Sequence, residues 1–421
     1  MNYFLIVLGK LLSNLVRKLN LGNGSTWPGH IALQFNKNFI TDVLSQSSAK
    51  TILVTGTNGK TTTAKLIETI LTDNGREVYS NISGANLLNG IASVLIEKSQ
   101  GGEIKADYLI FEVDENVVPL IPFSPDYIVA LNLFRDQLDR YGEIDTISRN
   151  WAKAYKAFTN AAFILNTDDP QIFNLAKGLN EKKLFFGLTG KTESLSLEHA
   201  ADSTICPNCG SNLTYEEIYY SHLGRWSCKK CGLYPNKSDI ADLEDYPLPG
   251  IYNRYNTLAA VLLTKELGIP FEKILTSIKN FTPAFGRQEE LKINNKTVKF
   301  FLAKNPTGFN ESLRTISKLG AKKVLIVLND RIPDGTDISW IWDVDFEMLH
   351  PGIEISVSGD RVYDLALRFK YAQINCVIYD ELEEAIGNNL EQLKEKEILY
   401  ILPTYSAMLE ARKIITGKKI L

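Results

Sequence analysis

The stretch that decides the fold is TILVTGTNGKTT, residues 51–62. Its β-branched and apolar start, residues 51–55, predicts a buried strand. Gly56 and Gly59 predict a turn, and a helix is expected to begin near Lys60. A strand, a glycine turn and a helix in this order place backbone N–H groups and the positive end of a helix dipole around an anion. The sequence therefore predicts a phosphate-binding loop.

The side chains of this loop indicate nucleotide chemistry. Lys60 would reach the β- and γ-phosphates, and the Thr61 hydroxyl would bind Mg²⁺. The spacing Gly-x-x-Gly-Lys-Thr differs from the general Gly-x-x-x-x-Gly-Lys-Thr motif. A chance glycine turn is the alternative, but the strand, the glycines, the lysine and the threonines coincide. The residues predicted to bind nucleotide here are Gly56, Thr57, Asn58, Gly59, Lys60, Thr61 and Thr62.

The remaining chain alternates short apolar runs with helical stretches. Residues 107–113, 127–132 and 162–166 are expected as buried strands, which together with 51–55 predict a doubly wound, mostly parallel α/β sheet. The pattern restarts after 281–289, with strands expected at 323–328, 374–379 and 398–402 and a helix at 406–416. We expect an N-terminal helical segment (1–45), a central ATP-binding domain (46–292) and a smaller C-terminal Rossmann-like α/β domain (293–421).

Composition argues against some partners and compartments. The net charge of −3 and the pI near 6.0 give no basic field, so nucleic acid is not expected as a partner. Residues 1–21 are amphipathic and lack the apolar core of a signal peptide or a membrane span. We expect a helix packed on the body, and an interfacial helix near a lipid-linked substrate is the alternative. The expected location is the cytoplasm, with peripheral binding at the inner face of the membrane as an option.

Four of the five cysteines form two Cys-x-x-Cys pairs, Cys206 with Cys209 and Cys228 with Cys231. This spacing is typical of a zinc ribbon, and four thiolates complete a tetrahedron without an open position. The sequence therefore predicts an insertion at about 200–240 that is folded by a structural Zn²⁺. A redox pair is the less favoured alternative.

His222 and Cys376 are not expected to take part in metal binding or catalysis. His222 lies between the cysteine pairs and is expected to be a surface histidine, because four cysteines already saturate the metal. Cys376 is expected to be a small buried hydrophobic residue in an apolar strand. The basic and aromatic residues of the insertion leave a nucleic-acid-binding module as a second hypothesis, but such a module explains neither the phosphate loop nor the segments after it.

The string Thr-Gly-Thr-Asn-Gly-Lys-Thr-Thr resembles the ATP loop of the Mur ligases and folylpolyglutamate synthetases. Further family blocks are matched in the same order, from residue 112 to residue 289. The resemblance implies a Mur ligase central ATPase domain in which Glu112 holds Mg²⁺ and Asn253 and Asn256 hold the adenine. Arg287 lies in the last of these blocks and is included among the nucleotide-binding residues.

The sequence departs from the ordinary Mur ligase pattern in three ways. Gln137 stands where the family usually has a metal-binding histidine, which puts a second Mg²⁺ in doubt. Lys153 lies near the position of a carbamylated lysine, but a solvated helix lysine is the favoured reading. Only about fifty residues precede Gly56, too few for a uridine-nucleotide-binding domain. The substrate is therefore expected to lack the uridine nucleotide that substrates of ordinary Mur ligases carry.

Three further motifs, PGHIA at 28–32, NPTGFN at 305–310 and DGTDISWIWD at 334–343, make the chain similar to the MurT family. These proteins are the Mur-ligase-like subunits of lipid II isoglutaminyl synthase. The resemblance implies that the α-carboxylate of D-glutamate in the lipid II stem peptide is activated as an acyl phosphate and amidated to D-isoglutamine. Catalysis would involve Lys60, Glu112 and Asp337.

The same resemblance implies a partner, a GatD-like glutaminase that supplies ammonia in a heterodimer. The orienting acid of the glutaminase triad would come from this chain, with Asp337 as the choice and Asp334 as the alternative, because Asp-Gly is also a turn signal. The runner-up function is a self-contained Mur- or folylpolyglutamate-type ligase that adds an amino acid.

Overall fold

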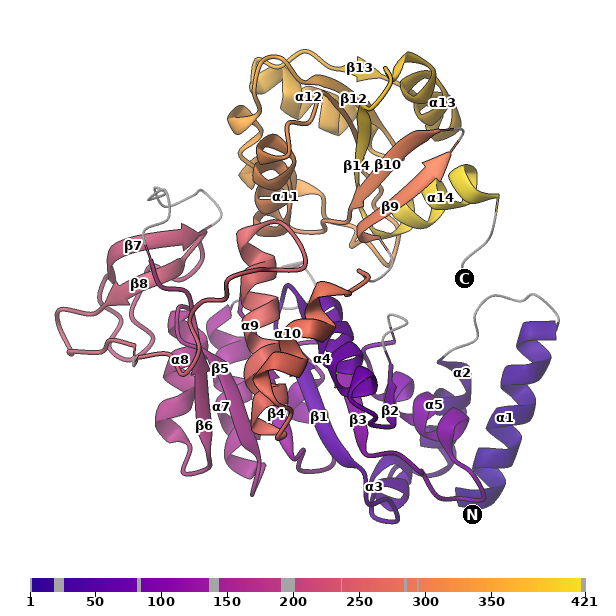
Figure 1. Cartoon of the computed structure of the whole chain (residues 1–421), viewed down its shortest axis with the longest axis vertical. Coiled ribbons are helices and arrows are strands. Elements are labelled where there is room, and N and C mark those ends of the chain that lie inside the picture. The colour runs from indigo at the N-terminus through magenta and orange to yellow at the C-terminus, as the bar shows by residue number, and fades with distance from the viewer. Residues whose placement is uncertain are drawn as a thin grey trace.

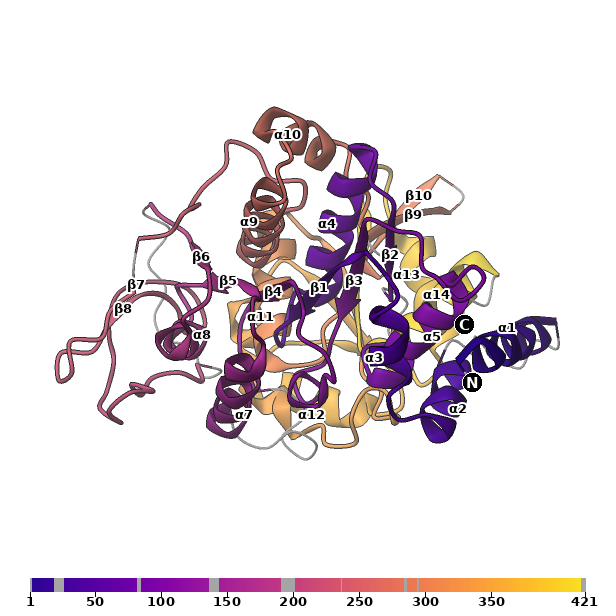
Figure 2. The ribbon, with the colours of Figure 1, turned by 90° about the horizontal axis from the view of Figure 1, so that it is seen from below.

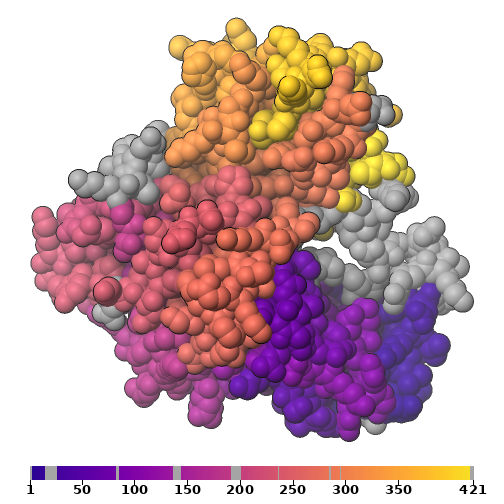
Figure 3. Space-filling model, viewed as in Figure 1, coloured from indigo at the N-terminus to yellow at the C-terminus, as the bar shows by residue number. Residues whose placement is uncertain are grey.

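The computed structural model describes residues 2–18, 26–81, 85–135, 144–190, 201–235, 237–283, 286–293 and 295–417. Within these ranges the chain forms two six-stranded sheets and one separate two-stranded hairpin. The second sheet and its helices lie above the first in Figure 1. The two-stranded hairpin lies at the left flank of the molecule, both in Figure 1 and in the same view of the surface in Figure 3.

The first sheet is parallel throughout and has the strand order β2-β3-β1-β4-β5-β6. From β1 the chain runs to the outermost strand β2, returns to β3 beside β1, and then crosses to the other side of β1 with β4. The carboxyl end of β1 is therefore a topological switch point, where open α/β sheets bind ligands. The strands are β1 (Lys50–Thr55), β2 (Val78–Ser80), β3 (Tyr108–Glu112), β4 (Tyr127–Ala130), β5 (Ala162–Asn166) and β6 (Lys183–Phe186).

Helices cover both faces of this sheet, which explains the unbroken apolar runs of its strands. Ile52 and Val54 pack towards one face and Leu53 towards the other, as the alternation of a strand requires. Figure 2 shows α4 (Lys60–Asp73), α9 (Ile251–Glu266) and α10 (Phe271–Lys279) on one side. On the other side lie α3 (Phe39–Leu44), α5 (Leu88–Lys98), α7 (Ile144–Ala157) and α8 (Pro170–Leu175), with the short 3-10 helices η1 (Val118–Leu120) and η2 (Ala176–Gly178).

The N-terminal helix α1 (Asn2–Lys18) packs on α2 (Trp27–Phe35) and α5, as predicted. Leu5 and Ile6 are buried, whereas Tyr3 and Phe4 are more than 60% exposed. Gly29 explains the PGHIA motif, because a Cβ there would lie 1.9 Å from a backbone oxygen of α5. None of the described helices is long and apolar enough to cross a membrane.

The second sheet has the order β13-β12-β11-β14-β10-β9 and is parallel except for the β9–β10 pair. Its strands are β9 (Arg287–Ile293), β10 (Lys296–Phe301), β11 (Lys323–Val327), β12 (Glu354–Ser358), β13 (Val377–Ile378) and β14 (Ile398–Pro403). One face is covered by α11 (Pro306–Lys318), α12 (Val362–Tyr371), η3 (Ser339–Asp343) and η4 (Phe346–Met348), the other by α13 (Leu382–Gln392) and α14 (Tyr405–Thr416).

The prediction of a buried strand at 374–379 is largely wrong. Only β13 forms there, at the edge of the sheet, and Val377 and Ile378 are 56% and 44% exposed. Cys376 precedes β13 and is half-buried instead of fully buried. An edge strand is unpaired on one side and can be open to solvent. An apolar run in the sequence therefore does not show that such a strand is buried.

The insertion stands outside both main sheets, as predicted. Its strands β7 (Thr214–Tyr220) and β8 (Leu223–Ser227) form an antiparallel hairpin of their own. A single two-stranded hairpin is marginally stable in water, so it needs packing or a metal to hold it.

Candidate nucleotide and metal sites

The phosphate loop lies between β1 and α4, at the switch point of the first sheet. Gly59 precedes α4 with a φ of +93°, in the left-handed region that glycine tolerates. A Cβ at this position would lie 2.0 Å from Asn256 Oδ1, so glycine is required for α9 to approach the loop. The N-terminus of α4 and the side chain of Asn256 therefore lie next to each other at the loop.

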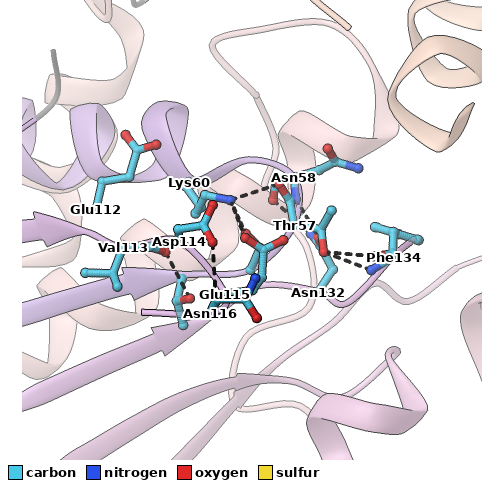
Figure 4. Close-up of polar contacts among 12 residues, drawn as sticks. Thr57, Asn58, Lys60, Glu112, Val113, Asp114, Glu115, Asn116, Asn132 and Phe134 are labelled. Carbon is cyan, nitrogen blue, oxygen red and sulfur yellow. Dashed lines mark hydrogen bonds and ion pairs between the residues drawn. The ribbon is translucent and has the colours of Figure 1, made fainter. Parts of the chain in front are cut away.

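The segment after β4 braces the loop from below (Figure 4). The Asn58 amide N–H donates to Asn132 Oδ1 at 2.9 Å, and Asn132 Nδ2 donates back to the Asn58 carbonyl at 3.0 Å. The Phe134 amide N–H donates to Thr57 Oγ1 at 3.0 Å. These contacts fix the loop before any ligand arrives, which is the condition for a preorganised anion site.

Lys60 forms a buried ion pair that the sequence analysis missed. Its ammonium lies 3.1 Å from Glu115 Oε2 and also donates to the carbonyls of Gly56 and Thr57. Burial acts to raise the pKa of Glu115, but the charges of Lys60 and Lys304 lower it overall. Glu115 therefore stays ionised and holds Lys60 within the loop, as Figure 4 shows.

Thr61 and Glu112 form a second pair beside this one. Thr61 Oγ1 lies 2.9 and 2.8 Å from the two carboxylate oxygens of Glu112. Glu112 ends β3, and Asn81 holds its backbone on both sides, accepting from its N–H and donating to its carbonyl. A hydroxyl and a carboxylate are oxygen ligands of the kind that Mg²⁺ takes together with phosphate oxygens. The pair fits the magnesium site that the family resemblance implies.

The structure describes only one of the two residues at which the sequence departs from the Mur ligase pattern near the metal site. Gln137 lies outside the described residues. Lys153 is exposed on α7, which agrees with the solvated reading.

A pocket opens between the phosphate loop and the second domain. The predicted nucleotide residues Asn58, Gly59, Thr62, Asn253, Asn256 and Arg287 line it, and the second domain adds Thr307 and Gly308 from the first turn of α11. The N-termini of α4 and α11 therefore both meet the pocket, and two positive dipole ends favour a polyanion there. Its other lining residues are Tyr220, Tyr252, Gln288, Phe301, Leu302, Glu311 and Ser312.

Asn305 couples the second domain to the loop. Its Oδ1 accepts from the Gly308 N–H at 2.8 Å and so caps α11, while its Nδ2 donates to Asn58 Oδ1 at 3.0 Å. Asn305 belongs to the motif at 305–310, but the motif alone assigns it no role. The Asn-Pro pair is itself a helix-start signal that could have suggested the cap.

The four predicted metal ligands come together. All four sulfurs lie within 4.8 Å of one another, with Cys206 and Cys231 at 3.7 Å and Cys209 and Cys228 at 3.5 Å. A tetrahedron with Zn–S bonds of about 2.3 Å has S–S edges of roughly 3.8 Å, so the cluster has the right size for zinc. A hydrogen bond from Ser211 lowers the pKa of Cys209 to about 6, and one from Asn208 lowers that of Cys231, whereas burial raises that of Cys206 to about 12.

The interpretation of His222 as a surface histidine is wrong. The side chain is fully buried, and its ring packs on Phe134 with 4.7 Å between ring centroids. His222 Nε2 lies 3.5 Å from Asp169 Oδ2. The four cysteines do leave His222 without a metal to bind, but the hairpin turn that carries it packs on the segment after β4 and so buries it.

The two candidate orienting acids differ in their surroundings. Asp337 is exposed and accepts from the Ser339 N–H at 2.8 Å. Asp334 is only 3% exposed and accepts from the backbone N–H and the hydroxyl of Ser406. Burial raises the pKa of Asp334. Of the two, Asp337 is free to reach a second protein, while Asp334 holds its own loop to the start of α14.

Comparison with sequence families finds matches to both large domains. The Mur ligase middle domain matches residues 54–264, and the MurT ligase C-terminal domain matches residues 302–408. The subunit MurT of lipid II isoglutaminyl synthase (glutamine-hydrolyzing) from Staphylococcus aureus is 33% identical over 94% of both chains. The protein of the same name from Streptococcus pneumoniae is 33% identical over 95% of this chain and 94% of its own.

Solved structures share the fold at lower identity. A pseudomurein peptide ligase type C from Methanothermus fervidus superposes with a TM-score of 0.67 at 21% identity, covering 90% of this chain and 81% of its own. The MurF ligase of Thermotoga maritima in complex with ADP superposes with a TM-score of 0.61 at 14% identity, covering 90% and 82%. The two-domain α/β architecture described above is thus that of the Mur ligases.

Proposed function

The chain belongs to the MurT family, it is a ligase of peptidoglycan synthesis, and from this premise we propose that it is the synthetase subunit of a lipid II isoglutaminyl synthase. In this proposal it activates the α-carboxylate of D-glutamate in the lipid II stem peptide with ATP. Ammonia then converts the activated carboxyl group to the amide of D-isoglutamine.

The reaction has two balanced steps. A carboxylate oxygen attacks the γ-phosphorus of ATP, which gives an acyl phosphate and releases ADP. Ammonia then attacks the carbonyl carbon and loses a proton, and inorganic phosphate leaves with one of the original carboxylate oxygens. Both steps move negative charge between phosphate and carboxylate oxygens, so they need fixed positive charge more than covalent chemistry.

The single observation that carries the proposal is the arrangement of Lys60, Thr61 and Glu112 at the phosphate loop, whose neighbouring residues Asn58, Gly59 and Thr62 line the pocket. Lys60 would neutralise charge on the transferred phosphoryl group, while Thr61 and Glu112 would hold the magnesium ion that the nucleotide brings. The lining residues Asn253, Asn256 and Arg287 would seat the nucleoside in the pocket. The N-termini of α4 and α11 add two sets of backbone donors for the phosphates between them.

A second subunit would supply the ammonia, because ammonium is not nucleophilic and free ammonia is scarce at neutral pH. We propose a GatD-like glutaminase in a heterodimer, with Asp337 orienting the histidine of its triad. The support is the exposure of Asp337 at the surface, where its carboxylate accepts a local hydrogen bond from the Ser339 N–H.

We also propose that the four cysteines hold one structural Zn²⁺. We expect close to one zinc per chain by elemental analysis of freshly purified protein, and its loss in the double variant Cys206→Ser, Cys228→Ser. A closed four-cysteine site contributes directly to folding, so the insertion should become sensitive to protease in that variant. Zinc-free wild-type protein, or a zinc-free variant with an unchanged proteolysis pattern, would contradict the proposal.

The nucleophile distinguishes this function from an amino-acid-adding ligase. We expect the chain alone, given lipid II and Mg²⁺-ATP, to form an amide with an ammonium salt at raised pH and to leave amino acids such as glycine unused. Mass spectrometry of the stem peptide separates the two products. Addition of an amino acid at a rate comparable with amidation would favour the self-contained ligase instead.

The substrate of this proposal is anchored in a lipid, so we propose that the enzyme works in the cytoplasm at the inner face of the membrane. The exposed Tyr3, Phe4 and Leu11 of α1 offer an apolar face for peripheral contact.

A further inference from the structure

The turn of the inserted hairpin is buried against the nucleotide site. Tyr219, Tyr220, Ser221 and His222 are each 2% exposed or less, although they join two strands of a hairpin that lies at the flank of the molecule. Ser221 adopts a φ of +50°, a left-handed conformation that costs a non-glycine residue free energy. A zinc site at the four cysteines does not by itself require the turn to be buried or to adopt this strained conformation.

His222 connects this turn to the segment after β4. Its ring packs on Phe134, and its Nε2 faces Asp169 Oδ2 at 3.5 Å. The same carboxylate oxygen accepts from the Leu133 backbone N–H at 2.8 Å. The turn therefore holds Leu133 and Phe134 from one side.

Those two residues continue the segment that braces the phosphate loop from the other side. Phe134 donates to Thr57 through its backbone, and Asn132 bonds to Asn58 at two places. A continuous chain of contacts thus runs from the hairpin turn through the segment 132–134 to the loop. A displacement of the turn would loosen the atoms that bind phosphate.

Tyr220 reaches the pocket directly. It lines the pocket together with Gly59 and Asn256, next to the residues proposed to seat the nucleoside. The ring is held by Phe134 at 5.7 Å and, edge-on, by Tyr255 at 5.7 Å between centroids. The part of the ring that lines the pocket is thus a rigid aromatic wall that a base can contact.

We propose that the hairpin is part of the ATP site: Tyr220 contacts the nucleoside, and His222 is a positioning residue that fixes the phosphate loop through Phe134. The inference rests on the proposed function in that it takes ATP as the ligand of the pocket. It adds a role for the insertion, whose cysteine cluster secures the open end of the hairpin while the turn serves the nucleotide.

The arrangement of the cysteines supports this division. Cys228 directly follows β8, and Cys206 lies in the loop that leads to β7. Trp226 of β8 donates from Nε1 to the Thr167 carbonyl at 3.3 Å, and the Gly224 N–H donates to the Asp168 carbonyl at 3.2 Å. The hairpin is thereby held at its cysteine end and along its length, so its turn keeps a fixed position against the first domain.

The test is equilibrium binding of a fluorescent ATP analogue to the full chain carrying Tyr220→Ala, Tyr220→Leu or Tyr220→Phe. Loss of one base–aromatic contact should raise the Kd on the order of 10-fold in the alanine and leucine variants. The phenylalanine variant keeps the ring and should bind within about twofold of wild type. Leucine keeps the space filled, so its thermal melting temperature should stay close to that of the wild type even if that of alanine falls.

His222→Ala is expected to raise the KM for ATP while its zinc content stays that of the wild type, because His222 is not a metal ligand. Tyr234→Ala is the matched control, since Tyr234 belongs to the same insertion but is 67% exposed and does not line the pocket. Wild-type nucleotide affinity in a folded Tyr220→Leu variant would overturn the inference and leave the proposed function intact. A wild-type chain that binds no ATP would overturn both.

Discussion

Replacing Lys60 by alanine is expected to abolish ATP-dependent amidation, with a fall in rate of at least about 10²–10³-fold, because a fixed donor to developing phosphoryl charge is lost. The rate is measured with saturating ammonium and without the glutaminase, so that only the synthetase reaction is read. Near-normal turnover would mean that the loop of residues 56–62 is not the nucleotide site.

The structure adds a complication that the sequence did not indicate. Removing Lys60 breaks the buried ion pair with Glu115 and leaves that carboxylate only the charge of Lys304, and breaking a buried ion pair costs about 3–5 kcal/mol of stability. The single variant should therefore also melt at a lower temperature. The double variant Lys60→Ala, Glu115→Gln removes the stranded charge.

The double variant is the matched control for folding. It should regain much of the lost melting temperature but none of the lost activity, because glutamine relieves the buried charge without replacing the lysine. If the double variant recovers activity together with stability, Lys60 acts through the fold and not on the phosphates.

Asp337→Asn is expected to separate the two activities of the complex. Glutamine-dependent amidation should fall by up to about 10⁴-fold, since asparagine stabilises the wrong histidine tautomer in a catalytic triad. The ammonia-dependent reaction at high ammonium and raised pH should keep much of its rate, because supplied ammonia bypasses the glutaminase. Both rates are measured on the purified heterodimer.

The neighbouring aspartate provides the control. Asp334→Asn replaces a buried acceptor of the Ser406 N–H and hydroxyl, so it should lower the melting temperature and affect both activities together. Equal loss of both activities in a folded, partner-bound Asp337→Asn protein would place Asp337 in the synthetase site or the domain core. Loss of glutamine use in Asp334→Asn alone would make Asp334 the orienting acid.

The parts of the fold that follow from local sequence were predictable. The strands at 51–55 and 162–166 are buried on both faces, so an unbroken apolar run identifies them. The loop before Lys60 and the two cysteine pairs carry their chemistry in fixed spacing. The short strand β12 was missed because its sequence, EISVS, alternates with polar residues, and Ser356 and Ser358 are nevertheless buried.

The contacts that complete the site were not predictable, because they join residues far apart in the chain. Glu115 meets Lys60 across 55 positions, and Asn305 meets Asn58 across 247. His222 was misread for the same reason, since only the packing of the hairpin turn on Phe134 buries it. Such partners are set by the strand order of the first sheet and by the approach of the second domain, neither of which has a local signature.

The most direct test of the central claim follows the oxygen atoms of the substrate. Lipid II is prepared with oxygen-18 in the α-carboxylate of its D-glutamate and is amidated by the chain with Mg²⁺-ATP and an ammonium salt. Activation as an acyl phosphate requires that a labelled oxygen appear in inorganic phosphate for every amide formed, and we expect that result. Label recovered in AMP, or amide formed without label in phosphate, would contradict the account.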